Sequence, residues 1–176
     1  VQPTPEAVLM VRGWLPKRSK PDTLRVGINI GCATDGAAHK RMPLEELASH
    51  IKAWQKNISI ELFLTGAENE FVINQSFFEC LEGINSMPKV AINLAGRTDL
   101  KTITALISEM DIFISTDSGP YHMAVALKVP TLCWLTDEGN GSIHQDLWVK
   151  CVVNPDEKIF LTAMNQLTDL FRSPHE

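Results

Sequence analysis

The chain has 176 residues, of which 44% are apolar, and this is enough for one domain of ordinary size with a full hydrophobic core. The formal net charge of −5 argues against a nucleic-acid-binding platform. No apolar run reaches the roughly 18 residues that span a membrane, and no signal peptide is visible at the start of the given sequence.

The first 23 residues differ in pattern from the rest of the chain. Residues 6–15 (EAVLMVRGWL) are compatible with a short helix or a short strand, and residues 16–22 (PKRSKPD) form a basic segment bounded by prolines. We interpret residues 1–23 as a linker or N-terminal extension that packs peripherally, and residues 24–176 as the domain itself. A linker before a complete domain suggests that another part precedes it in a longer protein.

From Leu24 onward, strand-like and helix-like patterns alternate regularly. Apolar or alternating runs predict six strands, at residues 24–30, 59–65, 90–94, 111–116, 131–135 and 149–153. Apolar residues at helical spacing predict five helices, beginning near residues 43, 68, 98, 121 and 156. The positions expected to face inward on these helices include Phe71, Leu100 and Ile159. The alternation predicts an α/β fold with a Rossmann-like, doubly wound parallel sheet.

In such a sheet the ligand binds beyond the carboxyl ends of the strands, where the strand order reverses. Four loops that follow strands are selected by this rule: residues 31–41, 65–70, 95–99 and 116–121. They hold most of the polar residues that interrupt the strands. We therefore expect these loops to form the binding site.

The last of these loops lies inside a strand–turn–helix–strand segment, residues 111–135 (DIFISTDSGPYHMAVALKVPTLCWL), which predicts a βαβ unit. We expect Pro120 at the first helical position and Asp117 or Ser118 as the helix cap. The backbone N–H groups around Gly119 are then free to face a ligand. Because a helix start favours negative charge, the turn predicts an anion-binding site.

The first loop combines a small-residue turn, Gly31 to Thr34, with a basic residue, Lys40, before the next helix. A hydroxyl and a positive charge in this arrangement suit a diphosphate, but a solvated loop with a basic helix entry explains the pattern equally well. Neither the G-x-G-x-x-G fingerprint nor the P-loop lysine motif is present there.

The second loop carries Glu68 and Glu70, and either carboxylate can accept hydrogen bonds from ribose hydroxyls. The alternative for each is an acid that interacts favourably with a helix N-terminus. His122, one helical turn after Asp117, is expected to face the same pocket, with a purely structural histidine as the alternative.

The four cysteines, Cys32, Cys80, Cys133 and Cys151, form no C-x-x-C pair. Buried free thiols in a reducing compartment are therefore favoured over a disulfide or a metal role. No cluster of His, Cys and Asp has the spacing of metal ligands, and no metal site is predicted.

Two stretches resemble glycosyltransferase family 9, the bacterial heptosyltransferases. The positions that match the signature of this family are Asp117, Ser118, Gly119, Pro120, His122, Ala124, Ala126, Leu127 and Pro130. Residues 93–100 (NLAGRTDL) are similar to the N-L-x-G-x-T-x-L turn of the same family. The resemblance covers residues 24–155.

The resemblance implies the C-terminal, donor-binding half of a two-domain GT-B glycosyltransferase. It implies a nucleotide-activated sugar as donor, ADP-linked and heptose-like, and transfer to a bacterial glycan or lipopolysaccharide acceptor. Such enzymes invert the anomeric centre without a metal, and no cofactor is implied. The implied location is cytoplasmic, free or peripheral at the inner membrane.

The resemblance also implies roles for individual residues. Those implied to bind the donor are Thr34 and Lys40 near the phosphates, Glu70 as the acid after the Gly-Ala turn, Gly96 and Thr98 in the turn that holds the adenine edge, and Asp117, Ser118, Gly119 and His122 in the signature. The catalytic base, an Asp, and the acceptor site are implied to lie in an N-terminal domain. No catalytic residue is therefore assigned within this chain.

Two other functions are compatible with the same pattern. A sugar-nucleotide epimerase-like GT-B domain also has an Asp-Ser-Gly turn before a helix, but Pro120 and His122 favour the transferase. A non-catalytic nucleotide-binding or assembly module is the alternative from another class. An N-terminal Rossmann-like half with a basic acceptor cleft would identify an enzyme.

Overall fold

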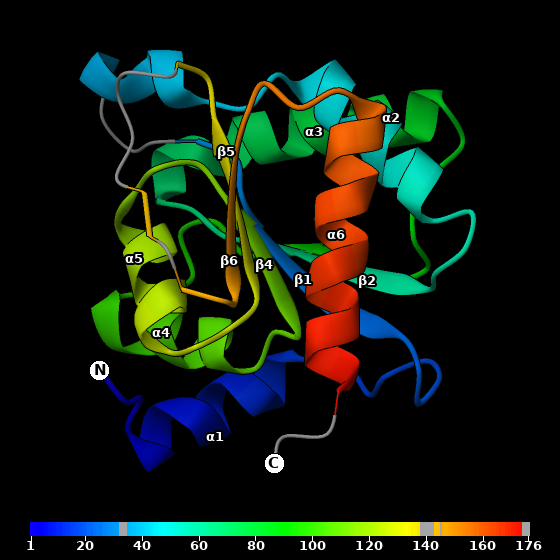
Figure 1. Ribbon diagram of the computed structural model, residues 1–176. Helices are drawn as coiled ribbons and strands as arrows, with labels where there is room; N and C mark the ends of the chain where they lie inside the picture. Colours follow the sequence, from blue (N-terminus) through cyan, green and yellow to red (C-terminus); the bar gives the residue numbers. More distant parts are fainter. Residues whose placement is uncertain (32–34, 138–142, 145, 174–176) are drawn as a thin grey trace.

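The computed structural model describes residues 1–31, 35–137, 143–144 and 146–173 (Figure 1). Its centre is a parallel sheet with the strand order β3-β2-β1-β4-β5-β6. The strands are β1 (Leu24–Asn29), β2 (Ile60–Leu64), β3 (Ala91–Asn93), β4 (Ile112–Ser115), β5 (Thr131–Leu135) and β6 (Val149–Val153). The predicted α/β fold with a Rossmann-like, doubly wound parallel sheet is confirmed.

Helices cover both faces of the sheet, as Figure 1 shows. They are α1 (Pro5–Trp14), α2 (Leu44–Trp54), α3 (Phe71–Gly83), α4 (Leu100–Ser108), α5 (Gly119–Ala126) and α6 (Glu157–Arg172), with short 3₁₀ segments η1 (Asp35–Lys40) and η2 (Glu68–Glu70). The helices α2, α3 and α6 pack on one face, and α1, α4 and α5 pack on the other. Among the described residues, none of the helices combines the length and apolar character that a membrane crossing requires.

Because helices cover both faces of the sheet, the strands are nearly continuous apolar runs. Successive side chains of a strand point to opposite faces, so a strand covered on both sides needs apolar residues at every position. In β2, Leu62 and Leu64 pack under α2 and α3, whereas Phe63 between them packs on the α4 side. The same alternation places Ile114 and Phe113 of β4 on opposite faces.

The strand order reverses beside β1, the central strand. After β1 the chain crosses to β2 and β3 on one side, and β4 then returns to the other side of β1. In the ladder with β1, Ile28 pairs with Leu64 and Asn29 pairs with Ser115, so the three strands end at the same edge. A crevice at that edge is where open parallel sheets bind ligands.

Residues 5–14, for which the sequence left helix and strand open, form the helix α1. The hydroxyl of Thr4 caps it by accepting a hydrogen bond from the backbone N–H of Ala7, at 3.3 Å. Ala7 and Val11 are buried in the cluster that α1 shares with α4. This segment therefore contributes two side chains to the hydrophobic core.

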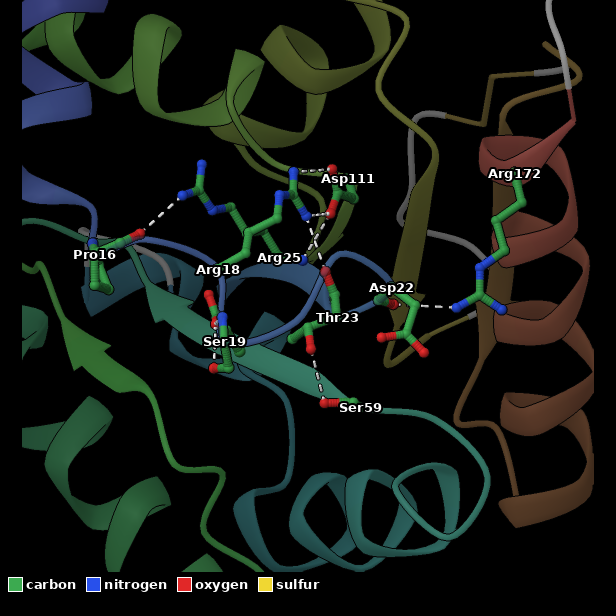
Figure 2. Close-up of polar contacts among 10 residues, drawn as sticks. Pro16, Arg18, Ser19, Asp22, Thr23, Arg25, Ser59, Asp111 and Arg172 are labelled. Carbon is green, nitrogen blue, oxygen red and sulfur yellow. Dashed lines mark hydrogen bonds and ion pairs between the residues drawn. The ribbon is translucent and has the colours of Figure 1, made fainter.

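The segment that follows α1 is held to the amino-terminal ends of the strands by polar contacts (Figure 2). The Arg18 guanidinium donates to both carboxylate oxygens of Asp111, and the backbone N–H of Arg25 donates to Oδ2 of Asp111 at 2.8 Å. Ser19 donates its N–H and its hydroxyl to Glu61, at 2.9 and 2.8 Å. The hydrogen bond from Arg18 to Asp111 raises the pKa of the guanidinium, so the pair remains charged at every pH at which the carboxyl is ionised.

Three residues expected to face the core are exposed instead. Phe71, Leu100 and Ile159 have exposed fractions of 43%, 72% and 49%. Each lies in the first turn of its helix, Phe71 and Leu100 as the first residue of α3 and α4. Their helical spacing is correct, but a first turn can extend past the layer of side chains that covers the sheet.

Candidate functional site

A cleft of about 480 Å³ opens at the carboxyl ends of the central strands. The residues that line it are Asn29, Gly31, Gly66, Ala67, Glu70, Thr98, Asp99, Leu100, Ile103, Asp117, Ser118, Gly119 and Pro120. All four loops selected from the sequence contribute to this lining. Of the predicted site residues, the structure brings Glu70, Thr98, Asp117, Ser118 and Gly119 into the cleft.

The turn before α5 presents backbone N–H groups to this cleft. Ser118 occupies the N-cap position, but its side chain makes no cap hydrogen bond. Its hydroxyl instead donates to the carbonyl of Thr116 at 3.2 Å and lies 3.1 Å from the hydroxyl of Ser115. Ser118 is thus the cap residue, one of the two predicted, although its side chain makes no cap bond, and Pro120 is the second helical residue rather than the first.

Gly119, the first residue of α5, leaves open space above the helix start. Among the described residues, a Cβ atom built on Gly119 meets no heavy atom within 4 Å, apart from its chain neighbours and its own helix. A ligand can therefore approach the backbone closely at this point. An anion is favoured there, because α5 begins with its partial positive charge directed at the cleft and without a side-chain cap.

Asp117 lies between two cationic or potentially cationic side chains. Its Oδ2 is 3.5 Å from Nζ of Lys40, and its Oδ1 is 3.5 Å from Nε2 of His122. The side chain of Asp117 is 11% exposed, that of Lys40 is 31% exposed and that of His122 is 46% exposed. Asp117 lines the cleft, whereas Lys40 and His122 are not among its lining residues.

Glu70 is buried at the bottom of the cleft, with 4% of its surface exposed. Its Oε2 accepts a hydrogen bond from the backbone N–H of Ala67 at 2.7 Å, which fixes the carboxylate against the turn. Its Oε1 is buried without a hydrogen-bond partner among the described residues. A Cβ on Gly31 would lie 3.0 Å from Oε1, so the glycine allows the carboxylate to approach β1.

Asn29, which the sequence analysis did not select, also lines the cleft. This last residue of β1 is 3% exposed, and its Nδ2 donates to the hydroxyl of Thr65 at 3.2 Å. Its Oδ1 is buried without a partner among the described residues. Buried acceptors are nearly always paired in proteins, so Asn29 and Glu70 together suit a ligand that brings hydroxyl or amino donors. In the sequence, the signal that could have identified Asn29 is its position as a polar residue at the end of an apolar strand.

The loop before α4 forms the other wall of the cleft. Asp99 caps α4 by accepting from the backbone N–H groups of Thr102 and Lys101, at 2.9 and 3.1 Å, and these bonds, that of Thr102 foremost, lower the pKa of Asp99. Thr98 lines the cleft. Gly96, with φ +80°, donates to the carbonyl of Gly66 at 2.9 Å and so joins two loops without lining the cleft.

The remaining predicted site residue, Thr34, lies outside the described residues. Among the described residues, no group of three or more His, Cys, Asp and Glu side chains is close enough to hold a metal ion.

Behind α5, a pair of facing thiols touches the first turn of this helix. Cys133 of β5 and Cys151 of β6 are directly opposite in the ladder, and the hydroxyl of Tyr121 lies 3.2 Å from Sγ of Cys151. Both cysteines are free. The hydrogen bond from Cys133, supported by that from Tyr121, lowers the pKa of Cys151 to about 6, and the pKa of Cys133 is raised by the same bond.

We expect Cys151 to be alkylated rapidly by iodoacetamide at pH 7 and to lose half of its rate near pH 6, because the pKa of the folded thiol is about 6. Buried Cys133 is the internal control and should react slowly at every pH. Mass spectrometry of alkylated peptides measures both rates. A midpoint near pH 8.5, the value of an ordinary thiol, would contradict the expectation.

Comparison with known proteins agrees with the family signature. The sequence model of "Glycosyltransferase family 9 (heptosyltransferase)" matches residues 25–137. The chain is 36% identical over 81 residues to "Lipopolysaccharide core heptosyltransferase OpsX" of Haemophilus influenzae, covering 46% of this chain and 21% of the relative. It is 31% identical over 107 residues to "Lipooligosaccharide heptosyltransferase 2" of Campylobacter jejuni. This match covers 61% of this chain and 32% of the relative.

Solved structures show the same fold. The structure of E. coli ADP-heptose lps heptosyltransferase II superposes with a TM-score of 0.79 at 17% identity, over 98% of this chain and 54% of that one. The glycosyl transferase family 9 structure from Veillonella parvula superposes with a TM-score of 0.74 at 16% identity, over 97% of this chain and 53% of that one. The chain thus spans about half of these structures and a third or less of the curated relatives. Since the family match covers more than half of its residues, this chain belongs to glycosyltransferase family 9, the heptosyltransferases.

Proposed function

We propose that this chain is the donor-binding domain of a heptosyltransferase, and that its cleft binds an ADP-linked heptose for transfer to a bacterial glycan or lipopolysaccharide acceptor. One observation carries this proposal: the start of α5, where the Ser118 side chain makes no cap bond, opens into the cleft at Gly119, and a Cβ placed there meets no heavy atom of the described residues within 4 Å beyond its own helix and chain neighbours. That arrangement suits a diphosphate. The relatives named above supply the sugar and the acceptor class.

The lining residues divide the cleft into three parts under this proposal. The diphosphate lies at Ser118 and Gly119, against the N–H groups of the helix start. The ribose hydroxyls donate to the unpaired oxygens of Glu70 and Asn29. The base then lies toward the wall that contains Thr98, and the sugar toward Asp117.

In the proposed reaction an acceptor hydroxyl attacks the anomeric carbon of the sugar, and the bond from that carbon to the diphosphate oxygen breaks. The departing ADP takes the electron pair, and a base removes the proton from the acceptor. This domain stabilises the charge that develops on the diphosphate, through the start of α5 and through Lys40 nearby. We assign the base and the acceptor site to another domain, and we propose inversion, no metal and a cytoplasmic location.

Calorimetric titration of the 176-residue chain with ADP, ADP-heptose, a UDP-sugar and a GDP-sugar tests the proposal. ADP and ADP-heptose should bind, and ADP-heptose should bind more tightly because Asp117 adds contacts with the sugar. Preference for a UDP- or GDP-sugar would overturn the assignment of the nucleotide. Equal affinity for ADP and every ADP-sugar would favour a non-catalytic nucleotide-binding module.

Asp117→Ala should weaken binding of ADP-heptose by about tenfold or more, the value of one hydrogen bond to a charged group. It should leave the affinity for ADP unchanged or slightly higher, because a carboxylate repels the diphosphate and its removal frees Lys40 and His122. Asp117→Asn, which keeps an acceptor oxygen, should lose less. Titration with both ligands measures the difference, and equal losses for ADP and ADP-heptose would refute a contact between Asp117 and the sugar.

A further inference from the structure

Two thiols face each other under α5, outside the cleft. Cys133 of β5 and Cys151 of β6 are directly opposite in the parallel ladder. Cys133 belongs to the buried cluster that also contains Tyr121 and Val125 of α5, and Cys151 packs against this cluster. Both side chains therefore point to the same face of the sheet. Neither residue lines the cleft, so the pair has no part in the donor site described above.

The spacing of the two residues fits a disulfide. Neighbouring strands lie about 4.8 Å apart, and disulfides join residues whose Cα atoms are about 4.4–6.8 Å apart. The thiol of Cys133 already donates a hydrogen bond to Sγ of Cys151, which brings the two sulfur atoms together. A bond between them can therefore form while β5 and β6 keep their register.

The groups around Sγ of Cys151 favour its thiolate. The hydroxyl of Tyr121 lies 3.2 Å from this atom. Burial, followed by this contact, raises the pKa of Tyr121, so the hydroxyl keeps its proton and donates. The hydrogen bond to Cys151, followed by burial, likewise raises the pKa of Cys133, which stays a donor. The thiolate is the nucleophilic form of a cysteine, so Cys151 is the member of the pair that attacks.

The exposure of the two residues differs in the same sense. Cys133 is 0% exposed, whereas Cys151 is only partly buried, so a small oxidant meets Cys151 first. Cys80 of α3 offers a reference within the chain. It is also free and partly buried, but it packs on the opposite face of the sheet, against the cluster under α2, α3 and α6.

We propose that Cys133 and Cys151 form a redox-active dithiol, in which Cys151 reacts with a hydroperoxide and Cys133 then closes a disulfide between β5 and β6. With hydrogen peroxide, the sulfur of Cys151 attacks one oxygen, the O–O bond breaks, and water leaves a sulfenic acid on Cys151. The sulfur of Cys133 then attacks the sulfur of that group, the S–O bond breaks, and the departing hydroxide takes the proton of Cys133 as water. Two thiols are oxidised, and one peroxide is reduced to water.

Oxidation of the 176-residue chain with hydrogen peroxide tests the proposal. Mass spectrometry of digested protein should find the disulfide between Cys133 and Cys151 as the main product, at peroxide concentrations that leave Cys80 reduced. Dithiothreitol should restore both thiols. The alternative is that the two cysteines only fill space as small apolar side chains. Oxidation of Cys151 no faster than that of Cys80, or oxidation that ends without this disulfide, would favour the alternative and overturn the proposal.

Two serine variants separate the two steps. In Cys133→Ser the hydroxyl can still donate to Cys151, so the first step should proceed and stop at a sulfenic acid that dimedone labels on Cys151. In Cys151→Ser, dimedone should label nothing at Cys133, because that thiol is buried and keeps its proton. Labelling of Cys133 in the second variant, or none of Cys151 in the first, would overturn the assigned roles.

Phenylarsine oxide measures the pairing without oxidation, because its arsenic bonds to two adjacent thiols and its oxygen leaves as water. In a Cys32→Ser, Cys80→Ser background, the folded chain should take up one equivalent. Adding Cys133→Ser or Cys151→Ser should abolish the uptake. A chain with both thiols that takes up none would overturn the pairing. None of these measurements uses a ligand of the cleft, so their outcome is independent of whether the cleft binds ADP-heptose.

Discussion

Gly119→Val is expected to abolish binding of ADP and ADP-heptose alike, with an affinity loss of about 100-fold or more, which corresponds to ~2.7 kcal/mol. The reason is steric. Beyond its chain neighbours and its own helix, a Cβ at this position meets no heavy atom of the described residues within 4 Å, so the valine side chain extends into the space above the start of α5, which we assign to the diphosphate. Calorimetric titration with both ligands measures the loss.

The fold should tolerate this substitution. Valine is a better helix former than the glycine that it replaces, so helix propensity gives no reason for the melting temperature to fall. Gly83→Val at the end of α3 is the matched control, since its Cβ also meets nothing within 4 Å and it lies away from the cleft. If Gly119→Val still binds ADP normally, the diphosphate lies elsewhere.

Asp111→Ala is expected to lower the free energy of unfolding by about 3 kcal/mol, the lower end of the range for breaking a buried ion pair. Asp111 is 5% exposed and accepts hydrogen bonds from Arg18 and from the backbone N–H of Arg25 (Figure 2). Its removal leaves a guanidinium and a buried N–H without that acceptor. We take the lower value because the side chain of Arg18 is 33% exposed, and water screens part of the loss.

Urea denaturation measures this loss, and Arg12→Ala is the control. Arg12 pairs with Glu109 at 3.1 Å, but its side chain is 61% exposed, so its loss should cost less than about 1 kcal/mol. Affinity for ADP should be unchanged in both variants under the conditions where they are folded, because both pairs lie away from the cleft. A loss in Asp111→Ala as small as that in Arg12→Ala would mean that residues 16–22 are only loosely held.

The sequence alone determined the order of the elements and the position of the turn at residues 117–120. Both follow from local properties: β-branched apolar runs of strand length, apolar residues at helical spacing, and a polar Gly-Pro break between a strand and a helix. Because parallel strands joined by helices bring their carboxyl ends to one edge, the loops at that edge were also predictable. The choice of Glu70 and Thr98 within those loops depended on the family resemblance, since the loop pattern did not distinguish Glu70 from Glu68.

The pairing of side chains was decided by the tertiary structure. Lys40 and Asp117 are 77 residues apart in the chain, and no local pattern relates them, so Lys40 read alone predicts a phosphate ligand rather than a partner of Asp117. Asn29 stands at the end of an apolar run, and only the packing of Thr65 and Glu70 around it reveals an unpaired oxygen. His144 contacts His122 across 22 residues for the same reason.

The tertiary structure also decided which residues at the ends of the helices are buried. Helical spacing identifies the inward face of α4, but Leu100 at its first turn extends past the sheet and forms part of the cleft wall. In α1 the pattern allowed a helix or a strand, and packing of Ala7 and Val11 against α4 selected the helix. Periodicity depends on neighbours a few residues away, whereas burial depends on how far each element extends over the others.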